Sequence, residues 1–352
     1  MAAENYAQAA ADAMRAHKLI PASVVPLSDA ATAAVKGGLW DDAIIYAKKA
    51  LQRDPKHINS LDALSHAYGG KDDWENVRIY GLQALQLRDG KIAARPRPPL
   101  SLPTFKPDGK KIISFSLFGG SSAYIEPAVL NAETAKDIYP EWTCRFYVDD
   151  SVPDTAIGRL KSNGAEIVRV DAEEAQWPGT MWRFLADDAE ASWVIFRDAD
   201  SVISHREAEA VKEWMASGKL FHTMRDAETH TELILAGLWG MAAGTVPDMK
   251  GKIRTYLQQP LVSRHFADQF FLREHIWAYA RQSLFAHDRI FGFLDAKPFS
   301  DGPMTDYRYN HIGCDEGNSH FQADYDLPDG SEVVWKLYSR IAPLLTPSAD
   351  IR

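Results

Sequence analysis

Apolar and polar positions follow two different patterns along the chain, one before and one after about residue 110. In the first part, the segment LWDDAIIYAKKALQ at 39–52 spaces its apolar residues like one face of a helix. It recurs as DWENVRIYGLQALQ at 73–86, an offset of 34 residues that aligns Trp40 with Trp74 and Tyr46 with Tyr80. The first part of the chain is therefore predicted to be helical and repetitive.

After Lys111, short apolar runs alternate with stretches of helical periodicity. The expected strands are 112–119, 144–150, 165–171 and 193–203, and the expected helices are 127–138, 155–163, 181–190 and 266–281. Alternation of this kind predicts a mostly parallel sheet with helices on both faces. Ligands of such sheets bind beyond the carboxyl ends of the strands, so we expect the functional residues where strands end.

The period of 34 residues resembles that of tetratricopeptide repeats, in which each unit is an antiparallel helix pair. Small residues at Ala43, Ala47 and Ala50 would let neighbouring helices approach closely, and the glycine pairs at 37–38 and 69–70 would form turns. Residues 1–90 hold about two and a half repeats, close to the minimum of about three for independent stability. We expect this array to be stabilised by contacts with the next domain or with another copy of itself. The alternative is a helical bundle in which the similarity of the two segments is accidental.

Residues 91–110 are predicted to form a basic, proline-rich linker, with five prolines between Pro96 and Pro107. The basic charge of this segment is explained by a solvent-exposed linker between the two parts of the chain. The second interpretation is that it attracts an anionic membrane or acceptor.

Charge is distributed unevenly over the 352 residues. Residues 1–96 contain 12 basic and 11 acidic residues, whereas the remainder contains 27 basic and 37 acidic ones. The negative charge of the second part disfavours binding to nucleic acid, which is also negatively charged. To bind a phosphorylated ligand, this part needs a cation that bridges the like charges. The sequence has two cysteines, too few for a disulfide framework, and no signal peptide, so it predicts a cytoplasmic protein. It has no run of about 20 apolar residues, so it predicts a soluble protein without a transmembrane segment, which at most binds peripherally to the inner face of a membrane.

Two carboxylates, Asp198 and Asp200, follow the apolar run Val194-Ile195-Phe196. Their i, i+2 spacing around the small Ala199 lets both turn toward one divalent cation such as Mn²⁺ or Mg²⁺. A solvated strand end is the alternative explanation of the tripeptide.

The wider context of these aspartates resembles the nucleotide-sugar glycosyltransferases of the GT-A fold. The resemblance rests on a first strand that ends in glycines, on Arg183 ahead of the Asp-x-Asp strand and on a later helix beginning Asp268-Gln269. It covers roughly residues 112–315, and is closest to the retaining branch typified by glycogenin and bacterial lipooligosaccharide galactosyltransferases. Leu235 and Phe270 depart from that branch, which has asparagine and aspartate there.

The resemblance implies an α/β GT-A domain at 111–345. Its activity would be metal-dependent transfer of a sugar from a nucleoside diphosphate to a saccharide, lipid-linked or protein acceptor, in the synthesis of surface polysaccharide or a glycoconjugate. The repeats would bind a protein partner or a second copy. Two alternatives remain: a non-catalytic repeat scaffold with an inert GT-A-like domain, and a nucleotidyltransferase, although the turn at 119–124 lacks the basic residue that this class usually needs.

The resemblance also implies residue roles. The metal ligands would be Asp198, Asp200 and His311, with His287 as the competitor for the third position. The donor-binding residues would be Arg183, Gly119, Gly120, Asp149, Asp150, Asp198, Gly237 and Trp239.

Several of these roles have alternatives. Asp149 and Asp150 equally suit strand-end caps, and Trp239 suits either an exposed acceptor wall or core packing. In a retaining enzyme Gln269 would lie on the back face of the sugar. In an inverting enzyme Asp268 would act as general base on the acceptor hydroxyl.

Overall fold

The computed structural model describes residues 2–103, 109–188, 190–300 and 311–314. Part of the predicted linker, 104–108, and the predicted end of the α/β domain, 315–345, lie outside these ranges. The chain divides into two compact units. The first comprises the N-terminal helices up to Arg97 together with segments 225–233 and 286–298, and the second comprises the rest.

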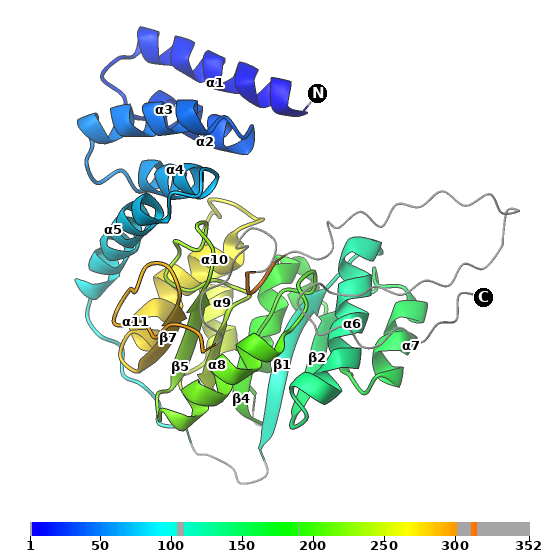
Figure 1. The fold of residues 1–352 in the computed structure, drawn as a ribbon. Helices are drawn as coiled ribbons and strands as arrows, with labels where there is room; N and C mark the ends of the chain where they lie inside the picture. Colours follow the sequence, from blue (N-terminus) through cyan, green and yellow to red (C-terminus); the bar gives the residue numbers. More distant parts are fainter. Residues whose placement is uncertain (1, 104–108, 189, 301–310, 315–352) are drawn as a thin grey trace, which may run out of the picture. The chain divides into compact units, whose positions relative to one another are not determined.

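The first unit is a stack of helices (Figure 1). They are α1 (Ala2–Leu19), α2 (Val25–Lys36), α3 (Trp40–Arg53), α4 (Ile58–Gly69) and α5 (Trp74–Ala93). Consecutive helices contact one another along the stack. The two repeated sequence segments are confirmed as helices: Trp40 and Trp74 are the first residues of α3 and α5. The end of α5 also makes residues 91–93 of the predicted linker helical.

Small residues bring these helices together as predicted. Ala43, Ala47 and Ala50 are fully buried. The turn between α4 and α5 lies directly against Trp40, because a Cβ on Gly70 would be 2.6 Å from Cδ2 of the indole. Asp73 caps α5 by accepting a hydrogen bond from the backbone N–H of Asn76 at 3.2 Å. The glycine turns and the aromatic at the start of α3 therefore fix the spacing between successive helices.

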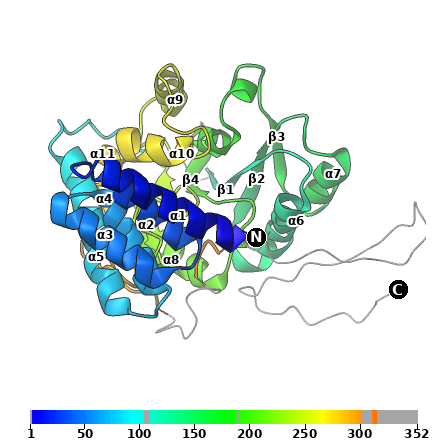
Figure 2. The same cartoon turned by 90° about the horizontal axis from the view of Figure 1, so that it is seen from above.

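The strands form a mixed sheet of order β3-β2-β1-β4-β6-β5-β7, which belongs to the second unit except for Arg225 of β5 and residues 286–288 of β7. The strands are β1 (Lys110–Leu117), β2 (Trp142–Val148), β3 (Glu166–Arg169), β4 (Ala191–Phe196), β5 (Phe221–Arg225), β6 (Trp239–Ala242) and β7 (Leu284–Asp288). The four predicted strands are confirmed as β1 to β4 and run parallel, side by side in Figure 2, although β4 ends at Phe196 and not at the predicted residue 203. The expectation of a mostly parallel sheet is wrong for the other half, because β6 runs antiparallel to both β4 and β5.

The two faces of β1 are covered by different elements. Ile113, Phe115 and Leu117 belong to a buried cluster that includes side chains of α6 (Ser122–Ile138) and α8 (His205–Ala216). Ser114 and Ser116 alternate with them and so point to the opposite face. There they bind the main chain of a 3₁₀ helix, Gly179–Ala186. The helix predicted over 181–190 is therefore present as a 3₁₀ helix, but its predicted bounds are wrong, because it begins at Gly179 and ends at Ala186.

The remaining helices largely follow the predicted pattern. The predicted helices at 127–138 and 155–163 are confirmed as α6 and α7 (Asp154–Ser162). The predicted helix at 266–281 is present as α10 (Ala267–Phe271), a π turn (Leu272–Ile276) and α11 (Trp277–Ala280). Helix α9 (Met249–Leu257) precedes it, and a short 3₁₀ turn (Glu174–Gln176) follows β3. None of the described helices has the length and apolarity to cross a membrane.

Candidate functional site

The sheet reverses its direction of growth between β1 and β4. The chain adds β2 and β3 on one side of β1 and then returns to add β4 on the other. Crevices beyond the carboxyl ends of strands at such switch points are where open α/β sheets bind ligands. Gly119 and Gly120 follow β1 at this edge, and Asp198 and Asp200 follow β4.

Arg183 lies at the centre of this edge and is 3% exposed. Its Nη1 donates to Asp198 Oδ1 and to the carbonyl of Arg197, and its Nη2 donates to Asp268 Oδ2 at 2.6 Å. The main chain at Arg183 is held in turn by the hydroxyls of Ser114 and Ser116, at 2.7 and 2.9 Å. The guanidinium therefore has a fixed position between two carboxylates from distant parts of the sequence.

Burial and charge act against each other in this cluster. Burial disfavours the charged form of Arg183, but Asp198 and Asp268 outweigh it and raise the guanidinium pKa above its usual value. Burial raises the pKa of Asp268, and Asp198 adds to that rise, although Arg183 opposes it. Asp198 has a side chain that is 45% exposed, against 8% for Asp268, so it is the more accessible of the two carboxylates.

Gly237 lies against Asp198. A Cβ at this position would be 2.5 Å from Asp198 Cγ, closer than side chains approach one another. The glycine therefore leaves the space that the carboxylate occupies.

Gln269 uses its amide group to hold the chain just before Gly237. Its Nε2 donates to the carbonyl of Ile234, and its Oε1 accepts from the N–H of Ala236 at 3.2 Å. Asp268 accepts from the N–H of Gln269 at 2.8 Å. The structure thus brings together five residues that the sequence analysis selected: Arg183, Asp198, Gly237, Asp268 and Gln269.

The predicted residues near β2 form a separate small network. Gly119, in the left-handed region at φ +77°, donates its N–H to Ser151 Oγ at 2.6 Å. Asp149 accepts from the backbone N–H and the hydroxyl of Ser151. Asp150 is exposed and pairs with Arg169 at 2.7 Å. Asp149 thus makes the backbone contact expected of a strand-end cap, whereas Asp150 makes a surface ion pair, and a role of either in donor binding stays a prediction.

Trp239 is the predicted site residue that the structure contradicts most clearly. The exposed acceptor wall is wrong, because the indole is 1% exposed and stacks on Phe196 with ring centroids 4.2 Å apart. Trp239 lies in β6 directly opposite Phe196 of β4, so cross-strand pairing buries it. The core-packing alternative is the one that the structure shows.

The predicted metal ligands are only partly assembled. Asp200 and His311 are half-buried, and His287 is buried in the first unit. Within the described ranges, no three His, Cys, Asp or Glu side chains are grouped so that they could hold a metal ion. A third protein ligand from His311 or His287 stays a prediction.

Sequence reasoning missed three residues at this edge. Ser114 and Ser116 hold Arg183, and two serines on one face of an otherwise apolar strand are the signal that could have identified them. Phe118 follows β1, is 44% exposed and contacts Trp182 edge-on, with ring centroids 5.6 Å apart. An exposed ring on a fixed partner offers a flat surface at the carboxyl edge of the sheet.

The similarities of this chain to known proteins are weak. No protein-family model matches the sequence, and no curated protein matches it. Among solved structures, 4-diphosphocytidyl-2C-methyl-D-erythritol synthase from Anaerococcus prevotii is 10% identical over 51% of this chain and 87% of its own, with a TM-score of 0.33. A mutant O-GlcNAc transferase from Thermobaculum terrenum is 16% identical over 55% of this chain and 44% of its own, with a TM-score of 0.27. Likeness this weak carries no argument about function.

Proposed function

We propose that this chain is a metal-dependent glycosyltransferase, which moves a sugar from a nucleoside diphosphate to a saccharide, lipid-linked or protein acceptor in surface polysaccharide or glycoconjugate synthesis. The observation that carries the proposal is the buried Arg183, bound to both Asp198 and Asp268 at the switch point of the sheet. These residues come from two of the three sequence features on which the resemblance to GT-A enzymes rests.

The charges at this edge support a need for a cation. Asp198 and Asp268 carry two negative charges, Arg183 offsets one of them, and Asp200 lies two positions after Asp198. A diphosphate entering such a site is repelled unless a divalent cation bridges the like charges.

The residues present suit Mg²⁺ or Mn²⁺. Mg²⁺ typically binds one or two carboxylates together with substrate phosphates and keeps several waters. Asp198 and Asp200 supply that number of carboxylates, so no third protein ligand is required. When bound, the cation would neutralise the diphosphate and stabilise its departure.

The protein residues would then have distinct tasks. Arg183 holds Asp198 in place, and Gly237 leaves room for it. Phe118 offers its ring to the nucleotide base. Asp268, whose pKa is raised by burial, suits a general base in an inverting reaction, whereas Gln269 faces the sugar in a retaining one. The stereochemistry of the product, determined by NMR, distinguishes the two reactions.

The proposal is tested with a panel of nucleotide sugars and MnCl₂. Thermal shift measures donor binding, and release of nucleoside diphosphate measures turnover. We expect one donor to stabilise the protein only when Mn²⁺ is present, and Asp200→Ala to abolish both signals. Asp137→Ala, an exposed aspartate in α6, is the matched control and should leave both unchanged. Absence of binding and turnover for every donor, or equal signals from Asp200→Ala and the control, would refute the proposal.

A further inference from the structure

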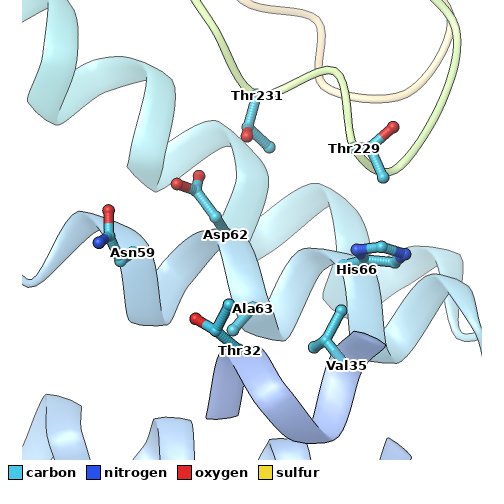
Figure 3. A pocket seen from close by; sticks show the side chains of 8 residues that line it. All are labelled: Thr32, Val35, Asn59, Asp62, Ala63, His66, Thr229 and Thr231. Carbon is cyan, nitrogen blue, oxygen red and sulfur yellow. The ribbon is translucent and has the colours of Figure 1, made fainter. Parts of the chain in front are cut away.

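A cavity of about 290 Å³, whose lining is mostly apolar with a few polar groups, lies within the helical unit. Thr32 and Val35 of α2 and Asn59, Asp62, Ala63 and His66 of α4 line one part of it. Thr229 and Thr231, from segment 225–233, line the other part, and the side chains of Asp62 and His66 lie between α2 and this segment (Figure 3). No residue of the candidate active site contributes to the cavity.

Segment 225–233 is fastened to the helices, so the cavity is preformed. Ser65 Oγ donates to the carbonyl of Glu228 at 2.7 Å. Arg88 donates to the carbonyl of Thr231 at 3.1 Å and pairs with Glu232 at 3.3 Å. The ring of His230 accepts from the N–H of Asp226 at 2.9 Å. Preformed walls lower the ordering cost of binding a small ligand.

The charges around the cavity disfavour an anionic ligand. Asp62 is the charged residue among those that line it, and Arg88 donates to both of its oxygens, at 2.9 and 2.6 Å. Arg88 is therefore committed to carboxylates and is not available to a phosphate. Burial lowers the pKa of His66, so its ring is neutral at physiological pH despite the opposing effect of Glu228. The lining offers hydrogen bonds without a spare positive charge.

The hydrogen-bonding groups match a molecule dense in hydroxyls. Each oxygen of Asp62 has a lone pair beyond the one that Arg88 uses, and a hydroxyl donor to a carboxylate makes a strong bond. Thr32 donates its own hydroxyl to the carbonyl of Ser28 at 3.0 Å, which leaves its oxygen as an acceptor. Asn59 and Thr229 are exposed and can both donate and accept.

The apolar part of the lining is the larger part. Val35 and Ala63 present aliphatic groups, and the ring of His66 is steadied by Trp40, with centroids 5.9 Å apart. A sugar ring has hydroxyls at its edge and C–H groups on its faces, which is the combination that this lining accommodates. The volume is at the small end of ligand pockets, which start at roughly 300 Å³, so it suits about one sugar ring.

We propose that this cavity is a non-catalytic binding site for a single neutral sugar unit, free or at the end of a glycan. The site is independent of the proposed transferase reaction and would hold if that reaction were a different one.

Ligand-observed saturation-transfer NMR on the full chain tests the proposal, with glucose, galactose, mannose and N-acetylglucosamine as probes. At least one should bind saturably, with a dissociation constant on the order of 1–10 mM, as expected for so small a ligand. Asn59→Leu and Thr229→Val remove hydrogen-bonding groups from exposed positions and should leave folding intact. Each should weaken binding about fivefold, the effect of one lost hydrogen bond.

Two controls separate this site from others. Gln52→Leu makes the same kind of change at an exposed position of α3 outside the cavity and should leave binding unchanged. Asp200→Ala with EDTA present should also leave it unchanged, which distinguishes this site from a donor-sugar site. The proposal is overturned if no sugar binds saturably, if Asn59→Leu and Thr229→Val bind like the control, or if glucosamine or glucose 6-phosphate binds more than about tenfold tighter than every neutral sugar, since charge would then dominate.

Discussion

The contact between Gly237 and Asp198 allows the carboxylate to be displaced without being removed. In Gly237→Ala the new Cβ would lie 2.5 Å from Asp198 Cγ, whereas ordinary contact begins at 3.4 Å. Gly237 is not among the residues with positive φ, so alanine introduces no backbone strain of that kind. The carboxylate is the movable end of a side chain, and we expect it to yield by about 1 Å.

That movement separates Asp198 from Arg183 and misplaces a proposed metal ligand. A hydrogen bond between charged groups contributes about 1.5–3 kcal/mol, so the free energy of unfolding should fall by about 2 kcal/mol and Tm by about 5 °C. Displacement of a positioned group by about 1 Å costs roughly 100-fold in rate, so kcat/KM for the donor should fall by about that factor.

Thermal scanning and nucleoside diphosphate release measure the two effects. Gly158→Ala is the matched control, because nothing lies within 4 Å of its added Cβ and its position inside α7 favours alanine. It should raise Tm slightly and leave turnover unchanged. If Gly237→Ala behaves like Gly158→Ala in both assays, Gly237 does not position Asp198 and this reasoning fails.

Three further predictions concern stability. Burial raises the pKa of Asp187 in the folded protein to about 6 from 3.8. The folded protein therefore binds this proton more tightly than the unfolded chain does. The free energy of unfolding should fall as pH rises from about 4 to 6, by at most about 3 kcal/mol. Asp187→Asn should therefore be more stable than the parent at pH 7 and equal to it at pH 4 in urea titrations. Trp239→Ala removes a buried side chain and should lower the free energy of unfolding by about 3–5 kcal/mol. Thermal scans followed by far-UV and near-UV circular dichroism should show unfolding at a lower temperature than in the parent. Arg88→Leu removes the cation that pairs with Asp62 and one of the cations near Glu232, and should cost about 3–5 kcal/mol.

Each of these has a contrary outcome. A parallel pH dependence in Asp187→Asn and the parent would show that this carboxyl titrates normally. An unchanged Tm in Trp239→Ala would contradict its place in the core. Full stability of Arg88→Leu would mean that segment 225–233 is not held by that ion pair.

The sequence by itself determined the repeated N-terminal helices and the four parallel strands. The repeat of Trp40 and Trp74 marked the starts of two helices, and the apolar runs marked β1 to β4, because burial of one face imposes a local period on the sequence. Turn residues and strand ends also marked the positions of Gly119, Asp198 and Asp268, since the end of an element is a local property.

The tertiary structure alone decided which of these residues meet. Arg183 and Asp268 are 85 positions apart and pair only because the fold brings them to one edge. A tryptophan such as Trp239 is compatible with either a surface or a core position, and its burial follows from the pairing of β6 with β4. Segment 225–233 belongs with the N-terminal helices through Arg88 and Ser65, although a long stretch of the other unit separates them in sequence. Contacts of this kind leave no periodic mark on a single sequence, because they depend on the closure of long loops and on the complementary shapes that result.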